Sequence, residues 1–215
     1  MTDTSFYAAL GLGFLLGLRH ALDADHVAAV STLVSQHRSL ARSCLLGTFW
    51  GLGHTLALLV AGVATIALRL SISAELERIL EKGVGCMLVL LGAHVLLRSF
   101  SGRLHTHQHA HARILGLGGR PFVIGLVHGM AGSAALMLVV AAAIPSALGG
   151  LLYILIFGAG ATAGMLVLSG LIGLPFAVTA NHSPRALVFI QVVAAVVSGV
   201  LGLTLLWTPH GLRTA

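Results

Sequence analysis

Six long apolar stretches alternate with short polar segments along the chain. A helix needs about 20 apolar residues to cross a bilayer, and most of these stretches reach that length. They cover residues 6–34, 43–68, 83–99, 121–143, 148–174 and 186–207. The pattern predicts an all-α polytopic membrane protein, a compact bundle of six transmembrane helices that forms one domain over residues 1–215.

Two of the stretches depart from the usual length. The first, over residues 6–34, would be roughly 43 Å long as one helix, so it must tilt, kink or project from the bilayer. We do not expect it to divide into two spans, because neither half would reach across. The third is short, with Lys82 and Arg98 at its ends, where their side chains can extend to the interface.

Prolines and glycines add detail to the predicted helices. Pro121 would open the fourth span, and Pro175 and Pro209 would close the fifth and sixth, because proline lacks the backbone N–H that a helix interior uses. Glycines four residues apart let helix backbones approach closely, which predicts a compact bundle rather than an open pore. These pairs are Gly13/Gly17, Gly47/Gly51, Gly125/Gly129 and Gly160/Gly164.

Composition agrees with a membrane protein. Hydrophobic residues make up 57% of the 215-residue chain and charged residues only 8%. The mean hydropathy is +1.00, which excludes a soluble globule of average composition. Twelve Lys and Arg against six Asp and Glu give a net charge of +6, but the basic residues lie between the apolar stretches. There they indicate topology and not a nucleic-acid surface.

The same basic residues predict the orientation of the chain, because cytoplasmic loops carry an excess of Lys and Arg. One side has Arg38, Arg42, Arg98, Arg103, Arg113, Arg120 and Arg185. The other side has Arg69, Arg78, Lys82 and Arg213. Seven against four places both termini outside the cytoplasm, in a bacterial-type inner membrane with the lipid bilayer as surroundings.

A polar cluster interrupts the first apolar stretch, with the sequence Arg19-His20-Ala21-Leu22-Asp23-Ala24-Asp25-His26. A charge at bilayer depth costs on the order of 3 kcal/mol, so such a cluster needs partners. On a regular helix His20, Asp23 and His26 would face one ion, and Asp25 would point away unless the helix is distorted. Imidazole with carboxylate suits Ni²⁺, Co²⁺ and Zn²⁺ better than Mg²⁺ or Ca²⁺. The alternative is an ion-pair network, with Arg19 paired to Asp23, that only holds helices together.

The segment RHALDADHV resembles the signature of the nickel/cobalt transporter superfamily, in which a His, four residues and then Asp-His lie in a transmembrane helix. The resemblance implies that His20, Asp25 and His26 select and carry the metal, and Asp23 fits the longer form of the signature. It also implies that the helix unwinds or bulges near Ala24, so that Asp25 reaches the ion. We expect both carboxylates to take part, because a buried aspartate facing lipid would be the costlier arrangement.

Two more histidines extend the resemblance. The second span contains Trp50-Gly51-Leu52-Gly53-His54-Thr55, similar to the Gly-His-Ser element of the superfamily, which implies that His54 is a ligand or supports one. The fourth contains Gly125-Leu126-Val127-His128-Gly129, similar to the small urease-accessory nickel permeases, whereas the larger transporters have an acidic residue and threonines there. Either histidine could instead be a core residue bonded to a backbone carbonyl. Thr162 and Met165 of the fifth span could line the same cavity or pack helices.

The predicted loop over residues 100–120 contains four alternating histidines, His105, His107, His109 and His111. Alternation places them on one face of an extended segment, and flexible histidine-rich tracts bind nickel-like ions weakly and reversibly. We interpret this tract as an auxiliary metal-binding loop. The alternative is a solvated low-complexity segment.

These features predict transmembrane transport of Ni²⁺, with Co²⁺ as an alternative substrate, in the direction of uptake. No GxxxxGK[ST] loop occurs in the sequence, so transport would use an ion gradient or a separate partner. We expect no resident cofactor, and nickel-enzyme maturation proteins as partners. Alternatives are efflux through the same site, a membrane metallochaperone for urease or hydrogenase assembly, and an intramembrane metalloenzyme. The enzyme is disfavoured because no HEXXH motif occurs.

Overall fold

The chain is almost entirely helical in the part that its computed structural model describes, which comprises residues 3–67, 73–100, 114–130, 141 and 144–207. No β-strand occurs in these residues. The helices are α1 (Asp3–His20), α2 (Ala24–Val34), α3 (Leu40–Gly62), η1 (Val63–Ala67), α4 (Ala74–Phe100), α5 (Ile114–Gly129), α7 (Ala147–His182) and α8 (Pro184–Trp207). The π-helix η1 continues α3 directly. The all-α prediction is therefore confirmed.

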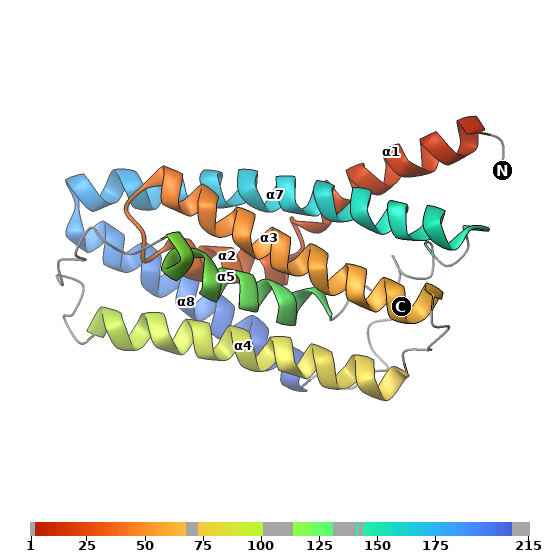
Figure 1. The fold of residues 1–215 in the computed structure, drawn as a ribbon. Coiled ribbons are helices and arrows are strands. Elements are labelled where there is room, and N and C mark those ends of the chain that lie inside the picture. Colours follow the sequence, from red (N-terminus) through yellow and green to blue (C-terminus); the bar gives the residue numbers. More distant parts are fainter. Residues whose placement is uncertain (1–2, 68–72, 101–113, 131–140, 142–143, 208–215) are drawn as a thin grey trace.

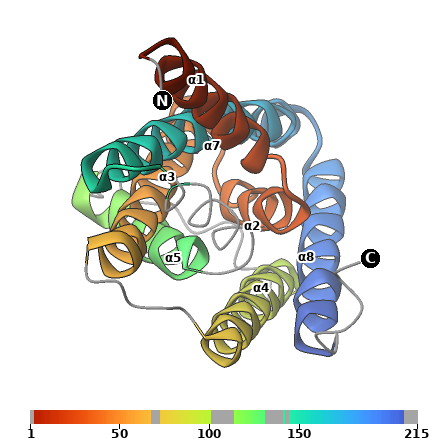
Figure 2. The ribbon, with the colours of Figure 1, turned by 90° about the vertical axis from the view of Figure 1, so that its right-hand side faces the viewer.

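The longer helices lie roughly along one axis (Figure 1). Viewed along that axis, α1, α7, α3, α5, α4 and α8 surround the short helix α2 (Figure 2). The helix α2 contacts α8, α7, α4 and α3, and most of its side chains are buried. The helices α1 and α8 run in opposite directions, so that α1 begins and α8 ends toward the same end of the bundle (Figure 1). The side of the membrane on which that end lies stays a prediction.

The prediction of six spans is confirmed only in a coarser form. Four helical segments of the described chain are long and apolar enough to cross a bilayer: Leu40–Ile66, Ala74–Phe100, Ala147–Ala180 and Pro184–Trp207. The bent pair Thr4–His20 and Ala24–Val34 makes a fifth if it counts as one span. The helix α5 covers the start of the predicted fourth span, and most of the rest of that span lies outside the described residues. The predicted histidine loop, with His105, His107, His109 and His111, also lies outside them.

The first predicted span is not one helix. It breaks between His20 and Ala24, and the two parts meet at an angle of 56°. Two proline predictions were also wrong, because Pro121 lies inside α5 and Pro175 lies inside α7. In an apolar environment an interrupted helix leaves backbone groups without water as a partner, so continuing the helix around a proline costs less than ending it. Pro184 does begin a helix, as the first residue of α8.

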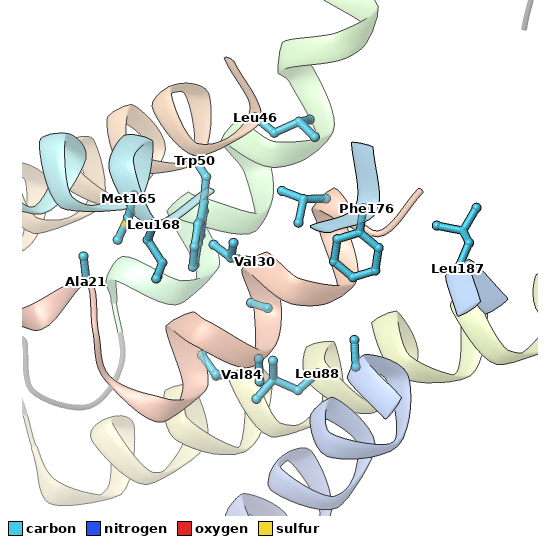
Figure 3. Packing of buried hydrophobic residues seen from close by; sticks show 14 residues of the cluster. Ala21, Val30, Leu46, Trp50, Val84, Leu88, Met165, Leu168, Phe176 and Leu187 are labelled. Atoms are coloured by element: carbon cyan, nitrogen blue, oxygen red, sulfur yellow. The ribbon is translucent and has the colours of Figure 1, made fainter. Parts of the chain in front are cut away.

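A hydrophobic cluster surrounds α2 and fixes it to its neighbours (Figure 3). Val30 of α2 and Trp50 of α3 are fully buried there, together with Met165 of α7 and Leu88 of α4. A polar contact adds to this packing, since the buried Gln191 amide donates to the Ser35 carbonyl at the end of α2, at 2.6 Å. The short helix is therefore held from several sides at once.

The predicted glycine pairs lie at close helix contacts. A Cβ atom on Gly17 would overlap the carbonyl oxygen of Phe157, and one on Gly160 would overlap that of Phe14, so the backbones of α1 and α7 touch. The helices α3 and α5 approach in the same way, with Gly125 against the Trp50 carbonyl. The prediction of a tightly packed bundle is confirmed at these positions.

The contact between α1 and α7 can be tested with two glycines of the same helix. Gly17→Ala should lower the free energy of unfolding by about 1–3 kcal/mol, because the added methyl group meets backbone that cannot move aside. Gly11→Ala is the control, since no atom lies within 4 Å of a Cβ atom there. It should leave the free energy of unfolding unchanged or raise it by up to about 1 kcal/mol, because alanine favours a helix interior over glycine. Thermal melting of the purified protein in detergent measures both. Equal melting temperatures for the two variants would contradict the close contact.

Candidate metal site

The break between α1 and α2 brings the polar cluster of the first apolar stretch into the bundle. The α1 helix ends in a tight turn, in which Leu22 N–H donates to the Arg19 carbonyl at 2.9 Å and Asp23 N–H to the His20 carbonyl at 3.1 Å. Asp23 then has an extended backbone, with φ −60° and ψ 146°, and the next helix begins at Ala24. The regular-helix alternative for this segment was therefore wrong, and Asp25 does not point away from His26.

His20 and His54 meet in the interior, on α1 and α3. Their Nε2 atoms are 3.2 Å apart, and both side chains are buried, with exposed fractions of 7% and 1%. Two nitrogens bound tetrahedrally to one ion, each about 2.0–2.1 Å from it, would be about 3.3 Å apart. The pair therefore has the spacing of two ligands of one ion.

Asp23 fixes the orientation of His20. Its Oδ2 lies 2.9 Å from His20 Nδ1, while its own side chain is 44% exposed. Because a carboxylate only accepts hydrogen bonds, the imidazole proton is on Nδ1 and the lone pair is on Nε2, toward His54. Asp23 does not form the alternative ion pair with Arg19 among the described residues. Asp23 therefore orients His20 and belongs to neither group of possible ligand atoms among the described residues.

Asp25 connects the other two histidines. Its Oδ1 accepts from the backbone N–H of His26 at 2.9 Å and from His26 Nδ1 at 3.1 Å. Its Oδ2 lies 3.1 Å from Nε2 of His128, on α5. Asp25 is half-buried and the two histidines are buried. This carboxylate thus links the first turn of α2 to α5.

His26 occupies the centre of the cluster. Its ring centroid is 4.5 Å from that of His20, 5.3 Å from that of His54 and 4.3 Å from that of His128. The indole of Trp50 covers His26 at 5.3 Å. The arrangement gathers four imidazoles and one carboxylate from α1, α2, α3 and α5 into one buried group.

Three imidazole nitrogens in this group are buried and have no hydrogen-bond partner in the part of the chain that the structure describes: His26 Nε2, His54 Nδ1 and His128 Nδ1. An unsatisfied buried polar atom costs about 1–3 kcal/mol, so such atoms are rare in folded proteins unless a ligand uses them. For His26 and His128 the other ring nitrogen donates to Asp25, so the unpartnered nitrogen has a lone pair. Lone pairs in a buried site without a donor are suited to a cation.

The ligand atoms form two groups that could each hold a metal ion, His20 with His26 and His54, and Asp25 with His26 and His128. Within each group all ligand atoms lie within 4.8 Å of one another. No cysteine belongs to either group, which leaves a site of imidazole nitrogens and carboxylate oxygen. That donor set favours borderline divalent ions over Cu(I), Mg²⁺ and Ca²⁺.

Other side chains were assigned less well from the sequence. Thr162 bonds Thr55 across the α3–α7 contact at 3.0 Å, and Met165 lies in the hydrophobic cluster, so both pack helices. Two aromatic residues also belong to the site without having been predicted, because the rings of Trp50 and Phe157 lie against His26 and His20. Trp50 could have been found, because it precedes His54 by four residues and therefore shares its helix face. Nothing in the local sequence of Phe157 indicates its place.

Comparison with known proteins places these residues in a family context. Residues 6–112 match the NicO family, described as high-affinity nickel-transport protein. This match includes His20, Asp25, His26 and His54 but ends before His128. No solved structure matches the chain significantly.

Three relatives extend the comparison. A urease accessory protein, UreH, of Bacillus sp. strain TB-90 is 42% identical over 89% of this chain and 88% of its own length. A putative nickel/cobalt efflux system of Methanocaldococcus jannaschii is 27% identical over 68% of this chain and 67% of its own. A chloroplast protein of Arabidopsis thaliana, FOR GROWTH AND FERTILITY 1, is 28% identical over 92% of this chain and 58% of its own. With a relative this similar over nearly its whole length and a family match that includes the His/Asp signature, the chain belongs to the NicO family of high-affinity nickel-transport proteins.

Proposed function

We propose that this protein takes up Ni²⁺, with Co²⁺ as a second substrate, through the buried group of His20, Asp25, His26, His54 and His128. The observation that carries the proposal is the set of three buried imidazole nitrogens without a partner, at the point where four helices meet. Membership of a nickel-transport family supports the choice of cargo.

Each part of the group has a task in this proposal. His20 and His54 present two nitrogens at the spacing of one ion's ligands. Asp23 and Asp25 hold His20 and His26 in the tautomers that direct Nε2 inward. Trp50 and Phe157 cover the imidazoles with apolar surface, which limits the access of water and strengthens the attraction between the carboxylate and a divalent ion.

The membrane potential favours uptake. Moving one positive charge inward gains about 2.3 kcal/mol per 100 mV, and a divalent ion gains twice that. Two relatives carry names that suggest other outcomes, because one is called an efflux system and another a urease accessory protein. Flux in the opposite direction, or nickel binding without flux, would favour those alternatives.

Uptake of radioactive nickel by cells with and without the gene tests the function. Cells with the gene should accumulate nickel by a saturable process, and His26→Ala should abolish it while the protein still inserts, because His26 belongs to both ligand groups. His94→Ala is the matched control, since His94 is an exposed histidine on α4. Full uptake by His26→Ala would rule out this site as the pathway, and uptake equal to that of cells without the gene would rule out import.

The two aspartates should differ in their effect on nickel affinity. Asp25→Asn should weaken nickel binding by about 10–100-fold. Each carboxylate oxygen of Asp25 accepts a hydrogen bond from one histidine, His26 or His128, and the amide nitrogen that takes the place of one oxygen cannot accept it. Asp23→Asn should be milder, since the asparagine oxygen can still accept the single hydrogen bond from His20. Nickel titration of the purified variants measures both. A larger loss in Asp23→Asn than in Asp25→Asn would contradict the assigned roles.

Acid should inhibit transport. Protons compete with the metal for the imidazole lone pairs, so nickel affinity should fall as the pH is lowered through the range in which histidine protonates. The sign follows from the ligand chemistry, since the neutral form binds and the protonated form does not. Initial rates at fixed membrane potential and several pH values measure the effect. Affinity that rises toward low pH would exclude a site built from neutral imidazoles.

A further inference from the structure

The two groups of ligand atoms share one residue, His26, and otherwise differ completely. One group adds His20 and His54 and contains imidazole nitrogens alone. The other adds Asp25 and His128 and mixes nitrogen with oxygen. The outer histidines of the two groups are well separated, with 6.5 Å between the ring centroids of His54 and His128. His26 lies between them.

The two ring nitrogens of His26 differ in their surroundings. Nδ1 lies 3.1 Å from Oδ1 of Asp25, whose other oxygen contacts His128. Nε2 is buried and has no partner among the described residues. The Nδ1 edge of the ring therefore belongs to the Asp25 group, which leaves Nε2 as the nitrogen that can serve the group of His20 and His54.

A neutral imidazole has one lone pair on its two nitrogens, so His26 can serve only one group at a time. We propose, building on the transport function above, that the two groups are alternate stations for a single Ni²⁺, which passes from one to the other across the ring of His26. When the metal moves from Nε2 to Nδ1, the Nδ1 proton passes to the Asp25 carboxylate that contacts this nitrogen. Water then carries a proton from the carboxylate to Nε2, the nitrogen that the metal leaves, and the reverse passage returns it by the same route. The charge of His26 is the same before and after.

The difference in donors suits the two stations to different steps. Three imidazoles discriminate against Mg²⁺ and Ca²⁺, which prefer oxygen. The second station contains a carboxylate that is 35% exposed, so water can compete for the ion there. A selective station next to a more open one allows tight recognition without trapping the cargo.

Nickel titration of the purified protein in detergent tests the two stations through the variants His54→Ala and His128→Ala. The wild-type chain should bind one Ni²⁺. Each single variant should still bind one Ni²⁺, because it keeps one complete station, whereas the double variant should lose about 100-fold more affinity than the product of the single losses. His26→Ala should resemble the double variant, and His94→Ala should resemble the wild type. Single losses that multiply to give the double loss would overturn the proposal in favour of one mixed centre, and two Ni²⁺ per wild-type chain would overturn it in favour of independent sites.

X-ray absorption of the nickel-loaded single variants gives a second readout that does not depend on affinity. His128→Ala should show three imidazole ligands, and His54→Ala should show two imidazoles and a carboxylate. Identical ligand shells in the two variants would contradict separate stations. If His54→Ala does not fold, as judged by its melting temperature, His54→Gln replaces it, because glutamine keeps most of the volume and polarity.

Flux measured in proteoliposomes separates this proposal from the transport function. Both single variants should bind nickel and fail to transport it, since each lacks one station of the path. Transport by either variant at the wild-type rate would overturn the passage between stations and leave the transport function intact. If the binding and X-ray absorption results show two alternating stations but the wild-type protein gives no flux, the transport function is contradicted and the model of two binding stations is kept.

Discussion

The rest of the structure depends on the need to satisfy a broken backbone inside an apolar bundle. Between His20 and Ala24 the chain leaves helical geometry, and in lipid the freed peptide groups would have no partner. The tight turn satisfies part of them, and the Asp25 carboxylate accepts from the backbone N–H of His26 in the first turn of α2. This explains why α2 lies inside a ring of longer helices, and why the bundle needs close contacts to enclose an element of only 11 residues.

The candidate metal site follows from the same break. Polar side chains at bilayer depth persist only when they satisfy one another, and the change in chain direction makes that arrangement available. It turns Asp25 and His26 toward His128 of α5, while His20 at the end of α1 meets His54 of α3. Among the described residues, the hydrogen bonds cover some of the ring nitrogens and leave three of them without a partner. A purely structural network would leave fewer such atoms.

Much of this could be predicted from the sequence, and the misses have physical causes. The lengths of the apolar stretches identified the long helices. The RHALDADHV segment, together with His54 and His128, identified the residues that meet in the interior of the bundle. The break itself follows from no strong local signal, since neither glycine nor proline occurs between Arg19 and Val34, and only the interaction of Asp25 with a distant helix favours it. The predictions that Pro121 opens a helix and Pro175 closes one were wrong for a physical reason. The rules that place proline at helix ends come from chains in water, where a carbonyl freed by the proline finds other partners.

The glycine contacts divide the molecule into stiff and compliant parts. Backbone touches backbone between α1 and α7, between α3 and α5, and between α4 and α8, where Gly92 meets the Ala195 carbonyl. Contacts of that kind resist sliding, because no side chain can change rotamer to relieve them. The helix α2 has no glycine, and none of the nearest neighbours of the described glycines belongs to it. Its packing rests on side chains, and the Gln191 amide bonds the carbonyl at its end. A shift of α2 can therefore be accommodated by rotamer changes that the backbone contacts between the longer helices do not allow.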